Sequence, residues 1–312
     1  PGAVGQDQTT TLHRRALDVE TATTEYSGSG AVPGRLLNQF AMDEHHEHLH
    51  VATTSGLLGA PQTTSGVYVL EQDEHDLTVV GEVTGMGPGE DIRAVRFVGP
   101  TGYVVTFEKT DPLYAIDLSE PHTPEVTGEL KIPGFSTYIH PVDDDHLLTI
   151  AYDAQDMGVF SWFDGIMLQL FDVSDMTEPA LIHKEVIGTR GSSSEAATNH
   201  LAFNWFPAKE RLALPMAVCE GGGYGAYGSE MTFNGLMLWD VTAEDGFDYL
   251  GGVPHEMPGE DAGSCFNWWT QSNSSVKRSI LMDDWIFSIA KDVVLIAHAM
   301  DPVSPVQVLN LD

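Results

Sequence analysis

The stretch that decides the fold is IRAVRFVGPTGYVVTFEKTDPLYAIDLSEPHTPEVTGELKIPG, residues 92–134. It contains four short runs rich in β-branched and aromatic residues, separated by turn residues that include Gly-Pro, Asp-Pro and Pro-Gly. Such runs predict β-strands joined by tight turns. Four strands in one short unit, with no amphipathic helix between them, are typical of a blade of a β-propeller.

The same plan recurs along the chain. A β-rich run ending in Gly or Pro-Gly closes at five positions, spaced by 55, 45, 57 and 68 residues: Gly34, Gly89, Gly134, Gly191 and Gly259. We therefore predict an all-β protein, a β-propeller of four-stranded antiparallel blades. The predicted blades are residues 35–86, 90–131, 135–188, 192–255 and 260–312. A pair of β-sandwiches is the alternative fold, but it does not explain why Gly or Pro-Gly recurs at the end of each β-rich run.

Residues 1–34 form an N-terminal segment, within which 9–34 predict the outer hairpin of a preceding blade. Five blades and a half do not close a ring in the usual way. The hairpin could add to the last blade, further blades could precede Pro1, or a partner chain could complete the ring. We favour missing N-terminal blades, because an unpaired hairpin would expose a strand edge. The start, PGAVGQDQTTT, has neither Met nor a signal peptide and indicates a processed product or a fragment.

The net charge of the chain limits the classes of molecule that it can bind. The chain of 312 residues has 14 Lys+Arg against 46 Asp+Glu, a formal net charge of -32. Such a surface repels phosphate backbones and anionic membranes, so we expect no nucleic-acid partner. Only six of the basic residues are Lys, and this balance suits a halophilic or marine source, where salt screens self-repulsion. The sequence has no apolar run long enough for a transmembrane segment and no Walker A or GxGxxG pattern, so no nucleotide cofactor is expected.

Four strings then carry a family resemblance: VPGRLLNQFAMDE, the fold-deciding stretch up to DLSEP, GELKIPGFSTYIHPVDDDHLLTIAYD and GTRGSSSEAATNHLAF. Together they resemble secreted proteins with a C-terminal β-propeller domain, distantly related to WD40 repeats, from about residue 10 to 312. The resemblance implies a secreted or cell-surface location and a longer N-terminus. It brings no defined activity and no catalytic residues. The sequence departs from that pattern at DEHHEHLH, at the Gly-rich insertion 219–230 and at the cysteines.

The strongest local motif is DEHHEHLH, with His45, His46, His48 and His50. On a strand, His48 and His50 point to one face, where two imidazoles can share a metal ion. His45 or His46 could supply a third ligand from the preceding turn. Neutral imidazole suits transition metals, and copper is the first candidate. The alternative is a solvated hairpin. We expect the hairpin to be exposed and to contribute little to the core.

Carboxylates follow the Pro-Gly or Gly element in several of the repeated units. They predict a second metal site, for a hard cation that prefers oxygen ligands. In a propeller this segment leads to the innermost strand, so side chains from several blades would meet at one mouth of the channel. Calcium takes six to eight oxygen ligands and would suit such a ring. The alternative is an acidic rim without a bound ion. The candidate calcium ligands are Glu90, Glu195 and Glu260.

Cys219 and Cys265 both lie in Gly-rich loops, and we predict a disulfide between them in an oxidising compartment. This bond would join two loops that are rich in aromatic residues. Tyr224, Tyr227, Trp268 and Trp269 are then predicted to form a ligand platform. The alternative is ordinary packing.

Three functions remain open. The first is a secreted, non-catalytic β-propeller that binds a protein partner or another extracellular ligand, with a bound metal ion. The second is a copper-binding or copper-dependent protein that uses residues 45–50. The third is a hydrolase acting at the channel mouth, although no GxSxG motif supports a serine nucleophile. The sequence therefore favours a binding protein over an enzyme.

Overall fold

The computed structural model describes residues 8–57, 60–107, 111–132, 134–156, 161–223, 225–255, 265–268 and 270–311. These residues form β-strands, and the helical segments among them are single 3-10 turns: Gln39–Ala41, Glu195–Ala197, His200–Ala202 and Pro207–Lys209. The predicted all-β fold class with four-stranded antiparallel sheets is confirmed. No helix in the described ranges is long and apolar enough to cross a membrane. The chain divides into two compact units, Pro1–Phe135 with Asp175–Pro179, and Ser136–Ser174 with Ala180–Asp312.

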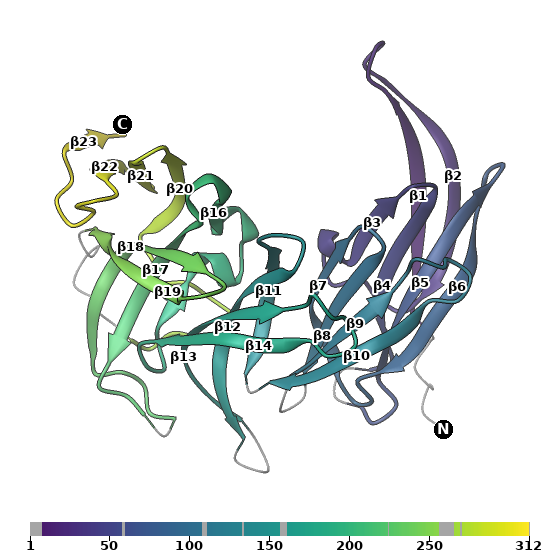
Figure 1. Ribbon diagram of the computed structural model, residues 1–312, viewed down its shortest axis with the longest axis horizontal. Coiled ribbons are helices and arrows are strands. Elements are labelled where there is room, and N and C mark those ends of the chain that lie inside the picture. The colour runs from purple at the N-terminus through teal and green to yellow at the C-terminus, as the bar shows by residue number, and fades with distance from the viewer. Residues whose placement is uncertain are drawn as a thin grey trace, which may run out of the picture. The chain divides into compact units, whose positions relative to one another are not determined.

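The first unit contains two sheets (Figure 1). The six-stranded sheet has the order β1-β2-β6-β5-β4-β3, and the four-stranded sheet has the order β10-β9-β8-β7. The strands of the first sheet are β1 (Thr9–Asp18), β2 (Thr23–Pro33), β3 (Met42–His45), β4 (His48–Ser55), β5 (Thr64–Asp73) and β6 (Asp76–Met86). Those of the second are β7 (Asp91–Val98), β8 (Thr101–Phe107), β9 (Asp111–Asp117) and β10 (Glu125–Ile132).

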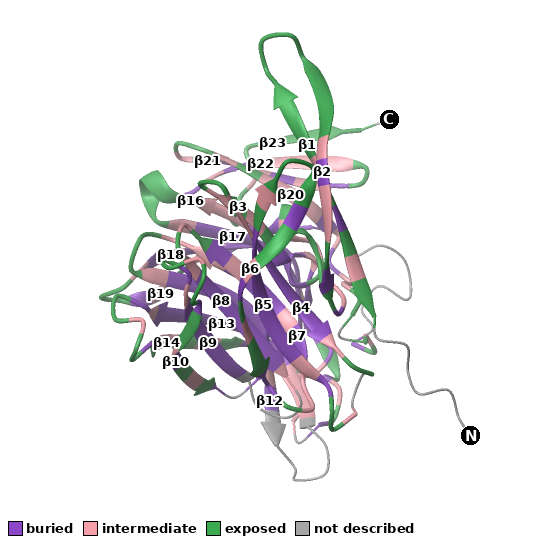
Figure 2. Cartoon of the chain, turned by 90° about the vertical axis from the view of Figure 1, so that its right-hand side faces the viewer, coloured by how far each residue is buried: buried purple, intermediate pink, exposed green. Residues whose placement is uncertain are grey.

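The core of this unit lies on both faces of β4 and β5, which are drawn mostly in the colour of buried residues in Figure 2. One face contributes Ala52, Val67 and Val69 to a cluster with residues of the second sheet, including Val104. The opposite face contributes a second cluster with β1, β2 and β6: Leu12, Val32, Val51, Tyr68, Leu70 and Leu77. A strand buried on both faces has a continuous apolar run rather than an alternating one. The sequence VYVL in β5 shows this run.

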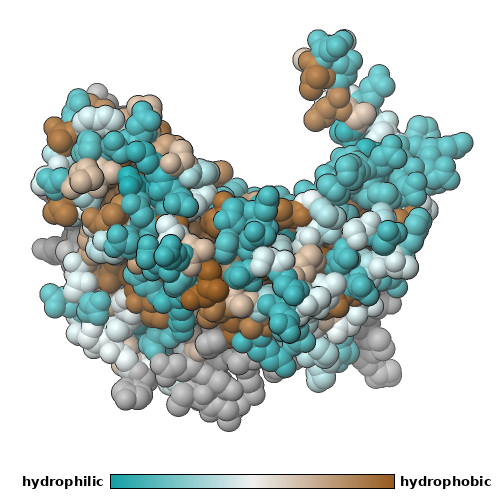
Figure 3. All heavy atoms as spheres, viewed as in Figure 1, coloured by the Kyte–Doolittle hydropathy of each residue, from teal (hydrophilic) through white to brown (hydrophobic). Residues whose placement is uncertain are grey.

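The N-terminal hairpin β1–β2 is attached to this sheet through β2. Two parallel residue pairs, Ser29↔Asp76 and Gly30↔Leu77, join it to β6. The contact requires glycine, because a Cβ on Gly30 would lie 2.1 Å from the Leu77 carbonyl oxygen. The tip of the hairpin projects with hydrophobic atoms exposed (Figure 3), and Leu17 and Val19 belong to it. The assignment of this hairpin to a preceding blade and the blade boundaries remain predictions.

The second unit contains three sheets, with the orders β11-β12-β13-β14, β15-β17-β18-β19 with β16 also paired to β17, and β20-β21-β22-β23. The strands of the first are β11 (Phe135–Pro141), β12 (His146–Asp156), β13 (Ser161–Asp172) and β14 (Ala180–Ile187). Those of the second are β15 (Ser193–Ser194), β16 (Asn204–Phe206), β17 (Arg211–Glu220), β18 (Glu230–Thr242) and β19 (Gly246–Pro254). Those of the third are β20 (Val276–Met282), β21 (Trp285–Ala290), β22 (Val293–His298) and β23 (Gln307–Asn310).

Hydrogen-bonded turns at strand ends occur in both units. Asp117 and Asp172 each accept a hydrogen bond from the backbone N–H two residues later, at 2.8 and 2.9 Å, which is an Asx turn at the end of a strand.

Trp239 on β18 is fully buried, and its Nε1–H donates to Glu185 at 3.2 Å. Burial raises the pKa of Glu185, and the bond from Trp239 opposes that rise. A buried indole is thus held by a polar partner from β14.

Candidate functional site

The His-rich hairpin consists of β3 and β4, joined by a turn in which His46 has a φ of 54°. The register pairs His45 with His48 and Asp43 with His50. Directly paired residues and residues two apart share a face of an antiparallel ladder. The three strand histidines and Asp43 therefore lie on one face of the hairpin.

His50 is a core residue, so the expectation of an exposed hairpin was wrong at this position. Its side chain is 1% exposed, and its ring centroid lies 5.6 Å from that of Phe97. Among the described residues, its Nδ1 has no hydrogen-bond partner. The pKa of His50 is lowered to about 4, chiefly by burial and in smaller part by the nearby His45 and His48. The sequence could not reveal this burial, because Phe97 belongs to the neighbouring sheet.

In the part of the chain that the structure describes, no group of three or more His, Cys, Asp or Glu side chains could hold a metal ion. The rings of His45 and His46 lie 4.1 Å apart and those of His45 and His50 lie 6.3 Å apart, measured between centroids. The copper site at His45, His46, His48 and His50 stays a prediction, as does the hydrolase alternative.

The candidate calcium ligands have local partners. Glu90 accepts a hydrogen bond from Thr106 in the first unit. Glu195 forms an ion pair of 2.8 Å with Lys277 in the second unit. Glu260 lies outside the described residues. Each described carboxylate thus has a partner within its own unit, and the calcium site remains a prediction.

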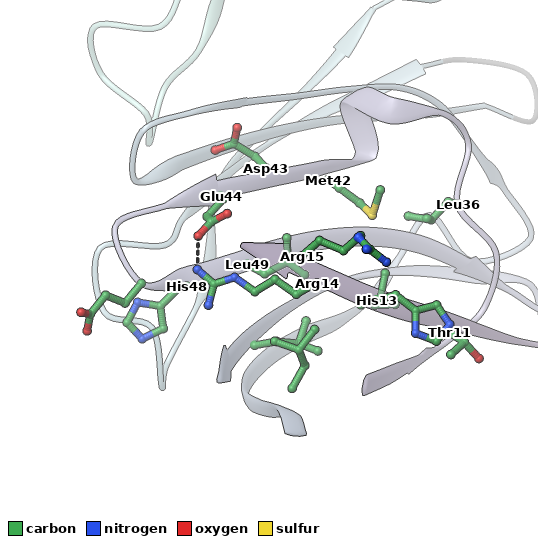
Figure 4. A pocket seen from close by; sticks show the side chains of 14 residues that line it. Thr11, His13, Arg14, Arg15, Leu36, Met42, Asp43, Glu44, His48 and Leu49 are labelled. Carbon is green, nitrogen blue, oxygen red and sulfur yellow. Dashed lines mark hydrogen bonds and ion pairs between the residues drawn. The ribbon is translucent and has the colours of Figure 1, made fainter. Parts of the chain in front are cut away.

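A cavity of about 580 Å³ lies in the first unit, where the sheet curls and both of its edge strands, β1 and β3, line it (Figure 4). Its lining combines apolar side chains, including Leu36, Met42 and Leu49, with polar and charged ones. Arg14 lines the cavity, and its Nη2 lies 2.5 Å from Oε1 of Glu44, the contact drawn as a dashed line. This volume is typical of ligand cavities. The ion pair balances the charges of Arg14 and Glu44.

The predicted disulfide Cys219–Cys265 is present in the second unit, with a Cα–Cα distance of 5.9 Å. Both cysteines are buried in a small cluster with Ala217 and Met231. Cys219 lies near the end of β17, at the first position of the Gly-rich insertion 219–230, and Cys265 precedes Phe266 and Trp268. The bond therefore attaches the segment 265–268 beside the insertion.

Aromatic side chains gather at this bond. Tyr227 and Phe266 have ring centroids 5.1 Å apart, and Tyr227 and Trp268 line one small cavity of about 20 Å³. Phe266 is 80% exposed and Trp268 is 55% exposed. We call Tyr227, Phe266, Trp268 and Arg190 the aromatic platform. Two members of the predicted ligand platform thus lie together, whereas Tyr224 and Trp269 lie outside the described residues.

Arg190 holds the platform together. Its Cζ lies 4.2 Å from the ring centroid of Tyr227 and 5.1 Å from that of Trp162, which are cation–π contacts. Its Nη1 donates to the carbonyl oxygen of Gly225 at 2.5 Å. Arg190 and Phe266 are not among the residues predicted for the ligand platform. Phe266 could have been found from its place next to Cys265, but Arg190 reaches the site only through packing.

One carboxylate lines the small cavity beside the platform. Burial raises the pKa of Asp164, Asp153 adds to the rise, and Arg190 opposes it. Exposed aromatic rings around a fixed guanidinium, with a carboxylate nearby, can bind a partner through stacking, apolar contact and hydrogen bonds. Among the described residues, no group of three or more His, Cys, Asp or Glu side chains at the platform could hold a metal ion.

We predict that Gly225→Ala disrupts the platform. A Cβ at Gly225 would lie 2.1 Å from the Trp162 ring, and its φ of +79° disfavours L residues. We expect a loss of about 3 kcal/mol, of which about 1 comes from the backbone and the rest from the clash. Gly85→Ala is the matched control, because its φ is +90° but nothing lies within 4 Å. Urea unfolding with near-UV circular dichroism measures both variants, and equal losses would show that the Trp162 contact is unimportant.

Comparison with known proteins identifies the family. The chain belongs to the family described as "Beta propeller domain", whose sequence model matches residues 3–301. An uncharacterized protein of Archaeoglobus fulgidus is 40% identical over 179 residues, which cover 57% of this chain and 26% of that protein. An uncharacterized protein of Methanocaldococcus jannaschii is 42% identical over 189 residues, covering 60% and 28%. The matched region spans about a quarter of the length of these curated relatives.

Solved structures support the same fold. The crystal structure of Sqt1 from Saccharomyces cerevisiae aligns with a TM-score of 0.50 and 11% sequence identity, covering 96% of this chain and 67% of Sqt1. At this identity the likeness concerns the fold alone. The predicted β-propeller architecture is therefore confirmed by the family match and by this structural neighbour.

Proposed function

We propose that the chain is a non-catalytic binding module, secreted or at the cell surface, whose aromatic platform contacts a protein partner. The observation that carries the proposal is the exposure of Phe266 and Trp268 beside a disulfide. Large aromatic side chains usually bury their rings, and exposed clusters of Trp, Tyr, Phe and Arg are typical of interface hot spots. The cross-link supports this role, because a held surface loses less conformational entropy on binding.

The disulfide indicates the compartment of the partner, and the net charge indicates the chemistry of its contact surface. Disulfides persist in oxidising compartments, which supports an extracellular or periplasm-like location. The net charge of -32 favours a partner whose contact surface is neutral or basic, and opposes nucleic acid. Association with a basic partner should slow as salt increases, since salt screens long-range attraction.

Site-specific photo-cross-linking tests the proposal. A benzophenone amino acid replaces Trp268 in one protein and Tyr249, an aromatic residue 47% exposed on β19, in a control. Each is irradiated with extracellular, envelope and cytosolic fractions of producing cells. We expect position 268 to capture a discrete protein from the extracellular or envelope fraction. Excess unmodified chain should compete for this capture, whereas a Phe266→Ala chain should not. Identical products from both positions would contradict the proposal.

A further inference from the structure

The first unit contains a second cavity, of about 440 Å³, which among the described residues shares only Leu36 with the cavity drawn in Figure 4. The turn that follows β2, the end of β4 and the start of β7 contribute to its lining. Two arginines, Arg35 and Arg93, are among the lining side chains. The chain has only 14 Lys+Arg against 46 Asp+Glu, so two guanidinium groups at one cavity are unexpected from composition alone. They indicate a local preference for a negatively charged group.

Hydrogen bonds fix the segments around this cavity. Arg35 and Thr54 exchange backbone hydrogen bonds of 2.9 and 3.0 Å between nitrogen and oxygen. The Oγ1 of Thr54, a buried residue, accepts another bond, of 3.1 Å, from the backbone N–H of Ile92. One residue near the end of β4 therefore holds both the turn after β2 and the start of β7. A cavity fixed in this way loses little conformational entropy when a ligand binds.

The guanidinium of Arg35 is committed to protein groups. Its Nη2 lies 2.5 Å from Oδ1 of Asp91, whose side chain is 9% exposed. Its Nη1 donates to the carbonyl oxygen of Gly56 at 2.8 Å. A buried carboxylate requires such a partner, because the burial of an unpaired charge is costly. The charges of Arg35 and Asp91 cancel, so this pair stabilises the cavity wall and leaves no net charge for a ligand.

Arg93 has no such commitment. Its Nε is buried but has no hydrogen-bond partner among the described residues, and no ion pair in that part of the chain includes its guanidinium. Arg93 is the extra residue of a β-bulge between Ile92 and Ala94, where the register to β8 shifts. Bulges commonly re-aim a side chain beside a binding site. A buried donor that no protein group satisfies is expected to bond with a ligand or with water.

We propose that this cavity binds a carboxylate with an apolar body and that Arg93 recognises the carboxylate. Since Arg35 and Asp91 cancel, the lining keeps one positive charge, which matches a monoanion better than a doubly charged phosphate. A guanidinium presents a planar pair of donors that complements a carboxylate. The net charge of -32 repels small anions in general, so binding here depends on this local contact.

The rest of the lining suits an apolar body. It includes four aliphatic side chains: Leu36, Leu37, Leu57 and Ile92. The volume of about 440 Å³ is within the range of small-ligand cavities. A small organic acid and the C-terminal residue of a peptide share this chemistry. The site lies in the first unit and goes beyond the proposed function, which concerns the platform of the second unit.

Titration of the whole isotope-labelled chain with hexanoate, followed by NMR at the arginine Nε–H groups, tests the proposal. We expect the Arg93 resonance to shift with a dissociation constant of about 1 mM, for a ligand of about eight non-hydrogen atoms. Hexanamide has the same length without the charge, and it should bind at least about tenfold more weakly, as should inorganic phosphate.

The peptide N-acetyl-Ala-Ala-Leu, with a free or an amidated C-terminus, distinguishes the two sources of the carboxylate. The free form should bind and the amidated form should not, because the amide has no charge for Arg93 to recognise. Tighter binding of the free peptide than of hexanoate would assign the site to a peptide terminus. Weaker binding would assign it to a small organic acid.

Arg93→Gln removes the positive charge and should raise the dissociation constant for hexanoate at least about tenfold, measured from backbone amide shifts at the start of β7. The matched control is Arg15→Gln, which removes one positive charge from an exposed position on β1 and should stay within about twofold of the parent. Thermal unfolding checks that each variant is folded. If Arg93→Gln is not folded, Leu57→Glu replaces it with the same expected loss, because it adds a carboxylate to the lining at a position 60% exposed.

Three results would overturn the proposal. The first is the absence of saturable binding of both hexanoate and the free peptide. The second is binding of a neutral analogue or of phosphate as tight as that of the carboxylates. The third is an equal effect of Arg93→Gln and Arg15→Gln, which would show that Arg93 does not contact the ligand.

Discussion

Removing the Cys219–Cys265 disulfide should lower the free energy of unfolding of the second unit by about 4 kcal/mol. The two cysteines are 46 residues apart, so the bond removes much chain entropy from the unfolded state. The variant is Cys219→Ala with Cys265→Ala, which leaves no buried polar group in the small apolar cluster around them. Urea unfolding monitored by tryptophan fluorescence measures the loss, and reductant should produce a similar loss in the parent protein.

The same variant should loosen the aromatic platform. The segment 265–268 would lose its covalent attachment beside the Gly-rich insertion, so amide hydrogen exchange at Phe266 and Trp268 should accelerate. Reductant should have no further effect on the alanine variant, which is the control for unspecific action. An unchanged midpoint and unchanged exchange in the reduced parent would show that noncovalent packing alone holds these loops.

Acidification from pH 7 to pH 4 should cost the first unit about 3 kcal/mol through His50. The pKa of His50 is about 4 in the folded protein, against 6.5 for an ordinary histidine. Between these values the unfolded chain binds a proton that the folded chain does not. Stability is therefore fully present above pH 6.5 and falls as the pH drops towards 4 and below. Urea unfolding across this range measures the dependence.

A non-titrating variant isolates this effect. His50→Leu should remove about 3 kcal/mol of the stability difference between pH 7 and pH 4, because no imidazole remains to be protonated. It should cost little at pH 7, since the Nδ1 of His50 has no partner among the described residues. His13→Leu, at an exposed position of the same unit, is the control and should keep the parent's pH dependence. Equal pH dependence in both variants would contradict the assignment to His50.

The fold could be predicted because its signals are local and repeated. Strand patterns such as IRAVRFV and GYVVTF, with turn residues between them, correspond to β7 and β8. The disulfide was also predictable, since both cysteines lie in Gly-rich stretches of the sequence, although Cys219 is on strand β17 and not in a loop. The burial of an individual residue within a blade was harder to predict. His48 and His50 look equivalent in the sequence, yet His50 is buried by Phe97, which comes from another sheet.

The platform could be predicted only in part for the same reason. Tyr227 and Trp268 were recognisable as aromatic residues near the cysteines. Arg190 and Trp162 come from segments with no such marker, and they join the site because Gly225 lets the insertion lie directly against the Trp162 ring. Contacts of this kind depend on tertiary packing, which a strand pattern does not encode.

The most direct test of the binding account is the affinity of the captured partner for single variants of the platform. Phe266→Ala and Trp268→Ala should each raise the dissociation constant at least about 30-fold, the effect of losing a hot-spot side chain. Tyr249→Ala, which removes an exposed aromatic ring elsewhere in the second unit, should stay within about threefold of the parent. Dissociation constants within threefold for all three variants would contradict the claim that the platform binds the partner.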